Sequence, residues 1–387
     1  MQMGKVQMNK RRAHGEGGVT SRGKNKWRIR YDGPAQADGS RKQISETVSG
    51  TKSKALAVLR KRIRSLEIGQ FVRPSQLTVS QYFNDWLRSH AEHVSFKTIE
   101  NYESMVRNHI DPTIGQINLQ NLEPHHLSAM SLVMSEKQLS PATRAYCHKT
   151  MRKALGDATR QNLIASNPAL LVTPPRQRRR EPETWTPSQF NMFLKAAEDD
   201  EFRDFFELAA LTGMRRSEIT GLKWDKVDLQ RNELRVAETL QRITGRGLVT
   251  GAPKTRGSRR VITLSLRTVE LLKGIRRRQL EQQLAIGSVY EDTGYVFTDQ
   301  LGQPYDSGRP SKHFLNVVRS TELPILNLHC LRHLHASVLL AAGTHFKVVS
   351  ERLGHSSVAF TMDVYQHLMP GMQEQAATTI DRELAAE

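Results

Sequence analysis

The second half of the chain contains four short patterns rich in arginine, histidine and lysine, and a tyrosine follows the last of them. The patterns span residues 211–219, 253–260, 328–336 and 353–357, and Tyr365 comes ten residues after His355. A phosphodiester under attack gains negative charge on its non-bridging oxygens, which arginines can clamp with paired, charge-assisted hydrogen bonds. A tyrosine hydroxyl, with an ordinary pKa of about 10, needs cationic surroundings and a proton acceptor to attack phosphorus. The patterns therefore predict attack by a tyrosine on a phosphodiester.

The side chains of these patterns have the chemical properties that the attack of a tyrosine on a phosphodiester requires. Arg215 and Arg332 can bind the phosphate oxygens, and loss of one donor from a well-studied oxyanion site costs roughly 3–4 kcal/mol. His329 and Arg332 are three residues apart, so a helix presents both on one face. His329 is then placed to accept the proton of Tyr365. Lys254, on a mobile turn, can protonate the leaving 5′ oxygen.

Other ways of activating a phosphate find little support in the sequence. His355 is expected to donate a hydrogen bond to the phosphate. With the two arginines it forms a group of phosphate-binding side chains that needs no metal. The histidines at 329, 333 and 335 leave a zinc site as an alternative, but no Cys or carboxylate stands at the spacing such a site uses. The arginines neutralise the charge that Mg²⁺ neutralises elsewhere, and no P-loop pattern is present. We expect no metal, no cofactor and no ATP.

Three of these positions keep a structural alternative. Arg215 and Arg216 could form a surface pair, and Lys254 could be a solvated lysine in a turn. Tyr365 could be a packed aromatic residue on an amphipathic helix. One arginine or one tyrosine decides nothing, so the interpretation rests on the four patterns together and on their order.

In this order the patterns resemble the catalytic domain of the tyrosine recombinases, also called the phage integrase family. The resemblance covers residues 185–370. In it, the Thr-Gly-x-Arg register selects Arg215 over Arg216, and Glu218 orients the site. Ser217 and Leu334 stand where glycine and threonine are common, and neither change removes a catalytic group. The catalytic set that the resemblance implies is Arg215, Lys254, His329, Arg332, His355 and Tyr365.

The resemblance also implies a reaction and partners. Tyr365 would form a 3′-phosphotyrosyl bond and release a 5′-hydroxyl, and the 5′-hydroxyl of a partner strand would reseal it. Two duplexes need four protomers, so a homo-tetramer on double-stranded DNA attachment sites is expected, with a directionality factor or a host DNA-bending protein as a further partner. The product would be an integrated or excised mobile element. The alternatives are a chromosome-dimer resolvase, a type IB topoisomerase and a catalytically idle DNA-binding regulator.

Residues 1–70 concentrate the positive charge of the chain. They carry 17 Lys and Arg against 5 Asp and Glu, an excess of 12 in a chain whose formal net charge is +18. Residues 26–31 alternate basic and apolar side chains, which predicts a strand with one cationic face, paired with residues 41–44 and followed by a helix over 51–68. A basic disordered tail before a helix is the alternative. We expect this face to contact DNA, through Arg22, Lys24, Lys26, Arg28, Arg30 and Arg41.

The rest of the chain is predicted to be mainly helical. Residues 75–168 carry two apolar stripes and a Ser140-Pro141 helix start, and they resemble a core-site-binding domain. Residues 169–184 form a basic, proline-rich linker. Residues 185–387 form the catalytic domain with its C-terminal tail, and they contain one short sheet with strands near 234–236 and 259–264. The fold class is therefore multidomain and mainly α with small β-sheets. It comprises a small α+β arm-type DNA-binding domain at 1–70, an all-α domain and an α+β catalytic domain.

The composition of the whole chain fits a nucleic-acid partner. A pI near 10.1 attracts polyanions. The two cysteines, Cys147 and Cys330, follow no metal-ligand spacing, and no apolar run approaches the roughly 18 residues of a membrane span. We therefore expect a cytoplasmic protein without a disulfide framework and without a membrane partner.

Overall fold

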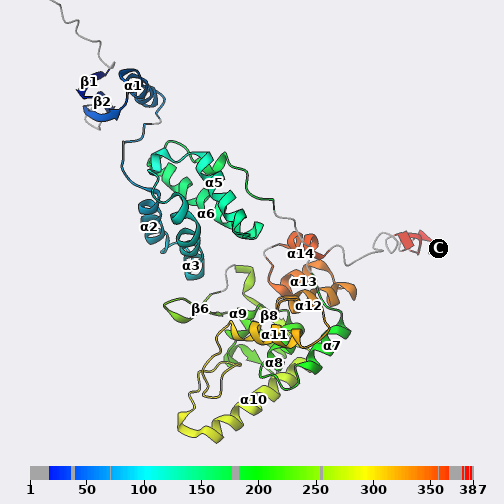
Figure 1. Cartoon of the computed structure of the whole chain (residues 1–387). Helices are drawn as coiled ribbons and strands as arrows, with labels where there is room; N and C mark the ends of the chain where they lie inside the picture. The colour runs from blue at the N-terminus through cyan, green and yellow to red at the C-terminus, as the bar shows by residue number, and fades with distance from the viewer. Residues whose placement is uncertain are drawn as a thin grey trace, which may run out of the picture. The chain divides into compact units, whose positions relative to one another are not determined.

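A computed structural model describes residues 17–35, 40–69, 71–176, 183–252, 256–355, 357–365, 377–378, 380–382 and 384–385. The chain divides into two compact units, Met1–Arg178 and Arg179–Glu387. Each unit is described by itself (Figure 1). Within the described ranges, no helix is long and apolar enough to cross a membrane.

The first unit begins with a three-stranded antiparallel sheet packed on one helix. The strands are β1 (Gly18–Gly23), β2 (Lys26–Ala35) and β3 (Arg41–Ser49), in that order, and the helix is α1 (Lys52–Glu67). Ile29 and Tyr31 are buried against Leu59, while Arg30 on the alternate face is exposed. The predicted sheet and helix are confirmed. Strand β1 was not predicted, because its short, Gly-flanked sequence has no apolar alternation.

A helical bundle follows in the same unit. Its main helices are α2 (Val79–His90), α3 (Phe96–Met105), α4 (Asp111–Ile114), α5 (Pro124–Glu136) and α6 (Pro141–Arg160). A π-helical turn (Val106–Ile110) joins α3 to α4, and 3₁₀ turns lie at Leu119–Asn121 and Pro168–Leu170. Both predicted apolar stripes are buried in one core. Ser140 caps α6 as predicted, and the helix ends before Asn162, whose φ of 54° is left-handed.

The second unit combines helices with two small sheets. Its helices are α7 (Pro187–Ala196), α8 (Arg203–Thr212), α9 (Arg216–Thr220), α10 (Leu266–Ile286), α11 (Arg309–Arg319), α12 (Cys330–Ala341), α13 (Phe346–Leu353) and α14 (Val358–Tyr365), with 3₁₀ turns at Trp224–Lys226, Arg256–Ser258 and Gly287–Val289. One sheet has the order β4 (Val227–Asp228), β5 (Glu233–Val236) and β8 (Arg260–Thr263). The β5–β8 pair confirms the two predicted strands.

The prediction of a single sheet in this unit is wrong. Residues 239–251 form a second, two-stranded sheet of β6 (Thr239–Ile243) and β7 (Gly247–Gly251). Its turn contains Gly245 and Gly247 at φ of 76° and 74°, values that glycine adopts without strain. The strands are short and weakly alternating, so hydrophobic periodicity does not reveal them.

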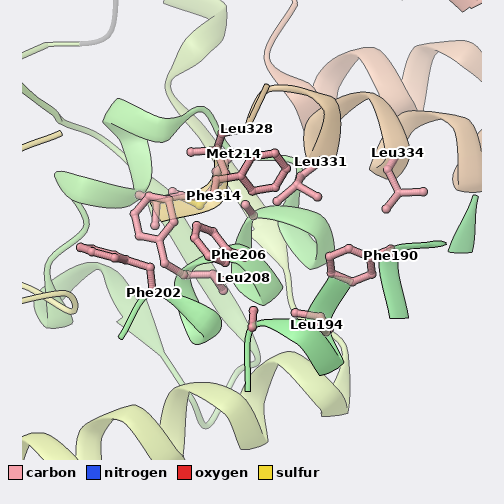
Figure 2. Close-up of a cluster of buried hydrophobic side chains, with 14 of the residues drawn as sticks. Phe190, Leu194, Phe202, Phe206, Leu208, Met214, Phe314, Leu328, Leu331 and Leu334 are labelled. Atoms are coloured by element: carbon pink, nitrogen blue, oxygen red, sulfur yellow. The ribbon is translucent and has the colours of Figure 1, made fainter. Parts of the chain in front are cut away.

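An aromatic core holds the helices of the second unit together. Figure 2 shows Phe206 from α8, Phe314 from α11 and Leu331 from α12 among its buried side chains. Met214, which immediately precedes Arg215, is also part of this core, at 2% exposure. Leu331 stands immediately before Arg332. The core therefore fixes the backbone on which both predicted catalytic arginines stand.

Candidate active site

The first predicted arginine lies at a sharp junction between two helices. Helix α8 ends at Thr212 and is capped by Gly213, whose φ of 65° is left-handed, and Arg215 is the N-cap of α9. A Cβ on Gly213 would lie 2.7 Å from a methyl carbon of Leu353 and 2.8 Å from the ring of His335. Glycine is thus required by both backbone angle and space, which explains the Thr-Gly-x-Arg pattern in physical terms.

Glu218 organises two arginines from separate elements. Its carboxylate accepts hydrogen bonds from the Arg215 guanidinium at 2.7 Å, from the Arg215 backbone N–H at 3.0 Å and from Arg260 of β8 at 2.9 Å. The side chain is almost fully buried. Burial would raise the pKa of this carboxyl, but the charges and hydrogen bonds of Arg260 and Arg215 hold it below its usual value. Glu218 is therefore an anionic anchor, as the resemblance implied.

The second arginine is buried at the centre of the site. Arg332 donates to the carbonyl oxygens of Gly213 at 2.7 Å and Leu353 at 2.6 Å, while Arg215 donates to that of Gly354 at 3.1 Å. The two guanidiniums thereby hold the turn that leads to His355. Burial, together with the charge of Arg215, lowers the pKa of Arg332 to about 9. A cationic site with this electrostatic cost is stabilised when an anion binds.

Tyr365 ends α14 with its side chain buried. Its exposure is 1%, and its hydroxyl lies 2.6 Å from Nδ1 of His333. Burial raises the pKa of Tyr365 to about 12, although the charge of Arg332 opposes this. Without DNA the tyrosine is therefore protonated at neutral pH. It belongs to an apolar cluster with buried side chains of α12 and α13, namely Ala336, Leu340, Phe346, Val349 and Leu353.

Three histidines surround this tyrosine and the arginines. His329 is the N-cap of α12, and its ring meets that of His333 edge-on at 4.9 Å. His355 shares a hydrogen bond of 2.7 Å with the Thr361 hydroxyl. Burial lowers the pKa of both His329 and His333 to about 4 and that of His355 to about 3, and Arg332 adds to each shift. All three imidazoles are neutral at pH 7, so each ring has one nitrogen that donates a hydrogen bond and one that accepts.

Five of the six predicted catalytic residues come together in this site. The pKa of His329 and that of His355 both respond to Arg215 and Arg332, and Arg332 acts on Tyr365. Lys254 lies outside the described residues. None of the described His, Cys, Asp and Glu side chains forms a group that could hold a metal ion.

Five of the six predicted DNA-contacting residues lie on strands of the N-terminal sheet, and Lys24 lies in the turn between β1 and β2. Arg28 stands opposite Thr20 and Thr47, and Arg30 opposite Gly18 and Ser45. All these partners are small, so the basic side chains dominate their face of the sheet. Of the six predicted DNA-contacting side chains, that of Arg28 is half-buried. The other five are exposed, namely Arg22, Lys24, Lys26, Arg30 and Arg41.

Family models place the chain among known proteins. The Phage integrase family model matches residues 183–371, and the model of the phage integrase N-terminal SAM-like domain matches residues 78–130. The chain belongs to the phage integrase family. It is thus a tyrosine recombinase, an enzyme class that performs site-specific recombination and the integration of mobile elements.

Individual relatives of this recombinase are distant but extend over most of its length. An integrase of Streptomyces ambofaciens is 28% identical over 97% of this chain and 98% of its own. The ICEBs1 integrase of Bacillus subtilis is 26% identical over 73% of this chain and 77% of its own. Among solved structures, the Tn1549 transposon integrase in complex with transposon right end DNA has a TM-score of 0.66 at 24% identity, covering 80% of this chain and all of that one. A lambda integrase tetramer bound to a Holliday junction has a TM-score of 0.56 at 16% identity over 88% of this chain and 95% of that one. These likenesses confirm the fold class.

Two residues of the site were not predicted as part of it. His333 contacts the tyrosine hydroxyl, whereas the sequence suggested His329 as its proton acceptor. His333 lies one helical turn after His329, so the same spacing argument could have found it. Arg260 shares Glu218 with Arg215. It is the last residue of the 253–260 pattern, but no role was assigned to it, because its pairing with Glu218 joins elements that are far apart in the sequence.

Proposed function

We propose that the recombinase cuts DNA through Tyr365, with Arg215 and Arg332 as the clamp on the phosphate. The observation that carries this proposal is the buried site in which the tyrosine hydroxyl shares its surroundings with both arginines. Such preorganised cations stabilise the charge that develops on the non-bridging oxygens. Lys254 is the proposed proton donor to the leaving 5′ oxygen, and His355 is the proposed hydrogen-bond donor to the phosphate. His329, which the sequence suggested as the acceptor of the tyrosine proton, belongs to the same proposed catalytic set.

The same proposal assigns a function to each of the other segments of the chain. Residues 1–70 bind arm-type DNA sites through the basic face of the sheet, and residues 75–168 bind the core site. Residues 169–184 serve as linker, and residues 185–387 carry the reaction. The SAM-like match within 75–168 and the charge of the first segment support this division. Four protomers act on two duplexes, and the tail beyond Tyr365 docks on a neighbouring protomer. A directionality factor or a DNA-bending protein sets the direction.

A covalent-adduct assay tests the nucleophile. The protein is mixed with a nicked duplex taken from the direct repeats that bound its element, so that the cut fragment diffuses away and the adduct accumulates. We expect wild type to form a protein–DNA adduct and Tyr365→Phe to form none. Tyr290→Phe, at a half-buried tyrosine in the same unit, is the matched control and should behave as wild type. An adduct with Tyr365→Phe would refute the assignment.

A further inference from the structure

The hydroxyl of Tyr365 has a direct partner that the sequence did not indicate. Nδ1 of His333 lies 2.6 Å from the tyrosine oxygen, and the contact joins α12 to α14. Arg332 and His333 follow His329 by three and four residues, so both side chains lie on the side of α12 that carries His329. The structure therefore places an imidazole nitrogen at hydrogen-bond distance from the proposed nucleophilic oxygen.

With both groups neutral, the direction of this hydrogen bond depends on the tautomer of His333. The pKa of His333, lowered by burial and by Arg332, is about 4, so the ring is neutral at pH 7. The tyrosine hydroxyl is protonated under the same conditions. A neutral ring with its proton on Nε2 leaves the Nδ1 lone pair free to accept from the tyrosine O–H. This is the arrangement that a general base requires before proton transfer.

We propose that His333 is a catalytic residue that accepts the hydroxyl proton of Tyr365 during strand cleavage. The inference rests on the proposed function. The tyrosine oxygen forms its bond to phosphorus as the bond from phosphorus to the 5′ oxygen breaks. The hydroxyl proton passes to Nδ1 of His333, and the leaving 5′ oxygen takes a proton from Lys254. Resealing reverses each transfer, so His333 returns its proton to the tyrosine oxygen.

The surrounding charges couple this transfer to DNA. In the free protein the proton stays on Tyr365, because Arg332 and the burial of both groups disfavour an imidazolium beside it. The other groups that face this pair are His329 from α12 and His355 from the turn before α14. A phosphate held by the two arginines adds negative charge at this place, which favours a protonated His333. The base therefore becomes effective when the substrate is bound.

Two substitutions separate proton transfer from hydrogen bonding. His333→Asn keeps an acceptor oxygen near the position of Nδ1 but cannot take a proton, and His333→Ala removes both functions. The rate of covalent adduct formation is measured at saturating protein on the nicked duplex, from about pH 7 to about pH 9. We expect both variants to cleave about 10²-fold or more slowly at neutral pH. Their rates should rise more steeply with pH than that of wild type, because hydroxide replaces the missing base.

The controls decide between the outcomes. His345→Asn changes an exposed N-cap of α13 where asparagine also caps, and it should cleave as wild type. DNA affinity and thermal unfolding establish that each variant is folded. Normal cleavage by both His333 variants overturns the inference, and so does normal cleavage by His333→Asn with slow cleavage by His333→Ala, since a hydrogen bond alone would then suffice. If wild type forms no adduct, or Tyr365→Phe forms one, the proposed function fails instead.

Discussion

At the scale of single residues, the site depends on one carboxylate that serves two cations. Glu218 is almost fully buried and accepts from Arg215 and Arg260, which belong to different elements. A buried ion pair that loses one partner leaves an uncompensated charge. The role of Glu218 is therefore both to position Arg215 and to stabilise the fold.

Glu218→Gln removes this negative charge with little change of shape. We expect the free energy of unfolding at pH 7 to fall by about 3 kcal/mol, since two arginines lose their counter-ion. The pKa of Glu218 is lowered in the folded state, so its stabilisation is present above the unfolded value and is lost as pH falls through the folded one. Denaturation curves should therefore show wild type and variant converging in acid.

A surface carboxylate provides the control for this prediction. Glu270 pairs with Lys273 on α10, and its side chain is 72% exposed. Glu270→Gln should change stability by no more than about 0.5 kcal/mol at any pH. An equal loss in both variants would mean that Glu218 acts as an ordinary surface charge.

At the scale of elements, the junction between α8 and α9 carries the most constraint. Gly213→Ala places a left-handed alanine against Leu353 and His335, and it disturbs the carbonyl that Arg332 uses. Gly245→Ala, in the β6–β7 turn, meets the same backbone strain with nothing within 4 Å of the new Cβ. We expect a cost of about 1–2 kcal/mol at 245 and a further cost of about 1–3 kcal/mol from overpacking at 213. Equal unfolding midpoints for the two variants would contradict the steric argument.

The elements that the sequence predicted are those with local signals. The Ser140-Pro141 start signal corresponds to the cap of α6, and the alternation over residues 26–31 corresponds to strand β2. The β6–β7 hairpin has neither alternation nor a strong turn pair, and it was missed. The partner of Tyr365 was missed for a different reason. Which imidazole meets the hydroxyl depends on how α14 packs on α12, and hydrophobic periodicity defines helices but not the facing of their polar groups.

At the scale of the whole molecule, the positively charged side chains of the catalytic unit and those of the N-terminal sheet differ in burial. The catalytic unit uses a few buried cations held by Glu218 and backbone carbonyls, which suits the binding of one phosphate at a fixed place. The N-terminal sheet instead presents exposed cations among small side chains. Such a surface suits contact with several phosphates and produces a strong dependence of affinity on salt.

Substitution of Arg28 and Arg30 by glutamine tests this division of labour. Both stand on the basic face of β2. Each phosphate that the protein no longer neutralises reduces the slope of log affinity against log salt by about 0.9 in magnitude. We expect the slope for a short mixed-sequence duplex to fall by about 2 in magnitude, because two such phosphates lose their cations. Cleavage at saturating protein should stay as in wild type, because the catalytic site is intact.

The matched control removes the same charge from the other unit. Lys273 and Arg277 lie on α10, each beside an acidic residue of the same helix, and their double glutamine variant should leave the slope unchanged. An equal fall in both double variants would mean that net charge alone sets the affinity. An unchanged slope for the Arg28 and Arg30 variant would show that the sheet face does not contact phosphates, and the arm-binding function of residues 1–70 would then have no support from its charge.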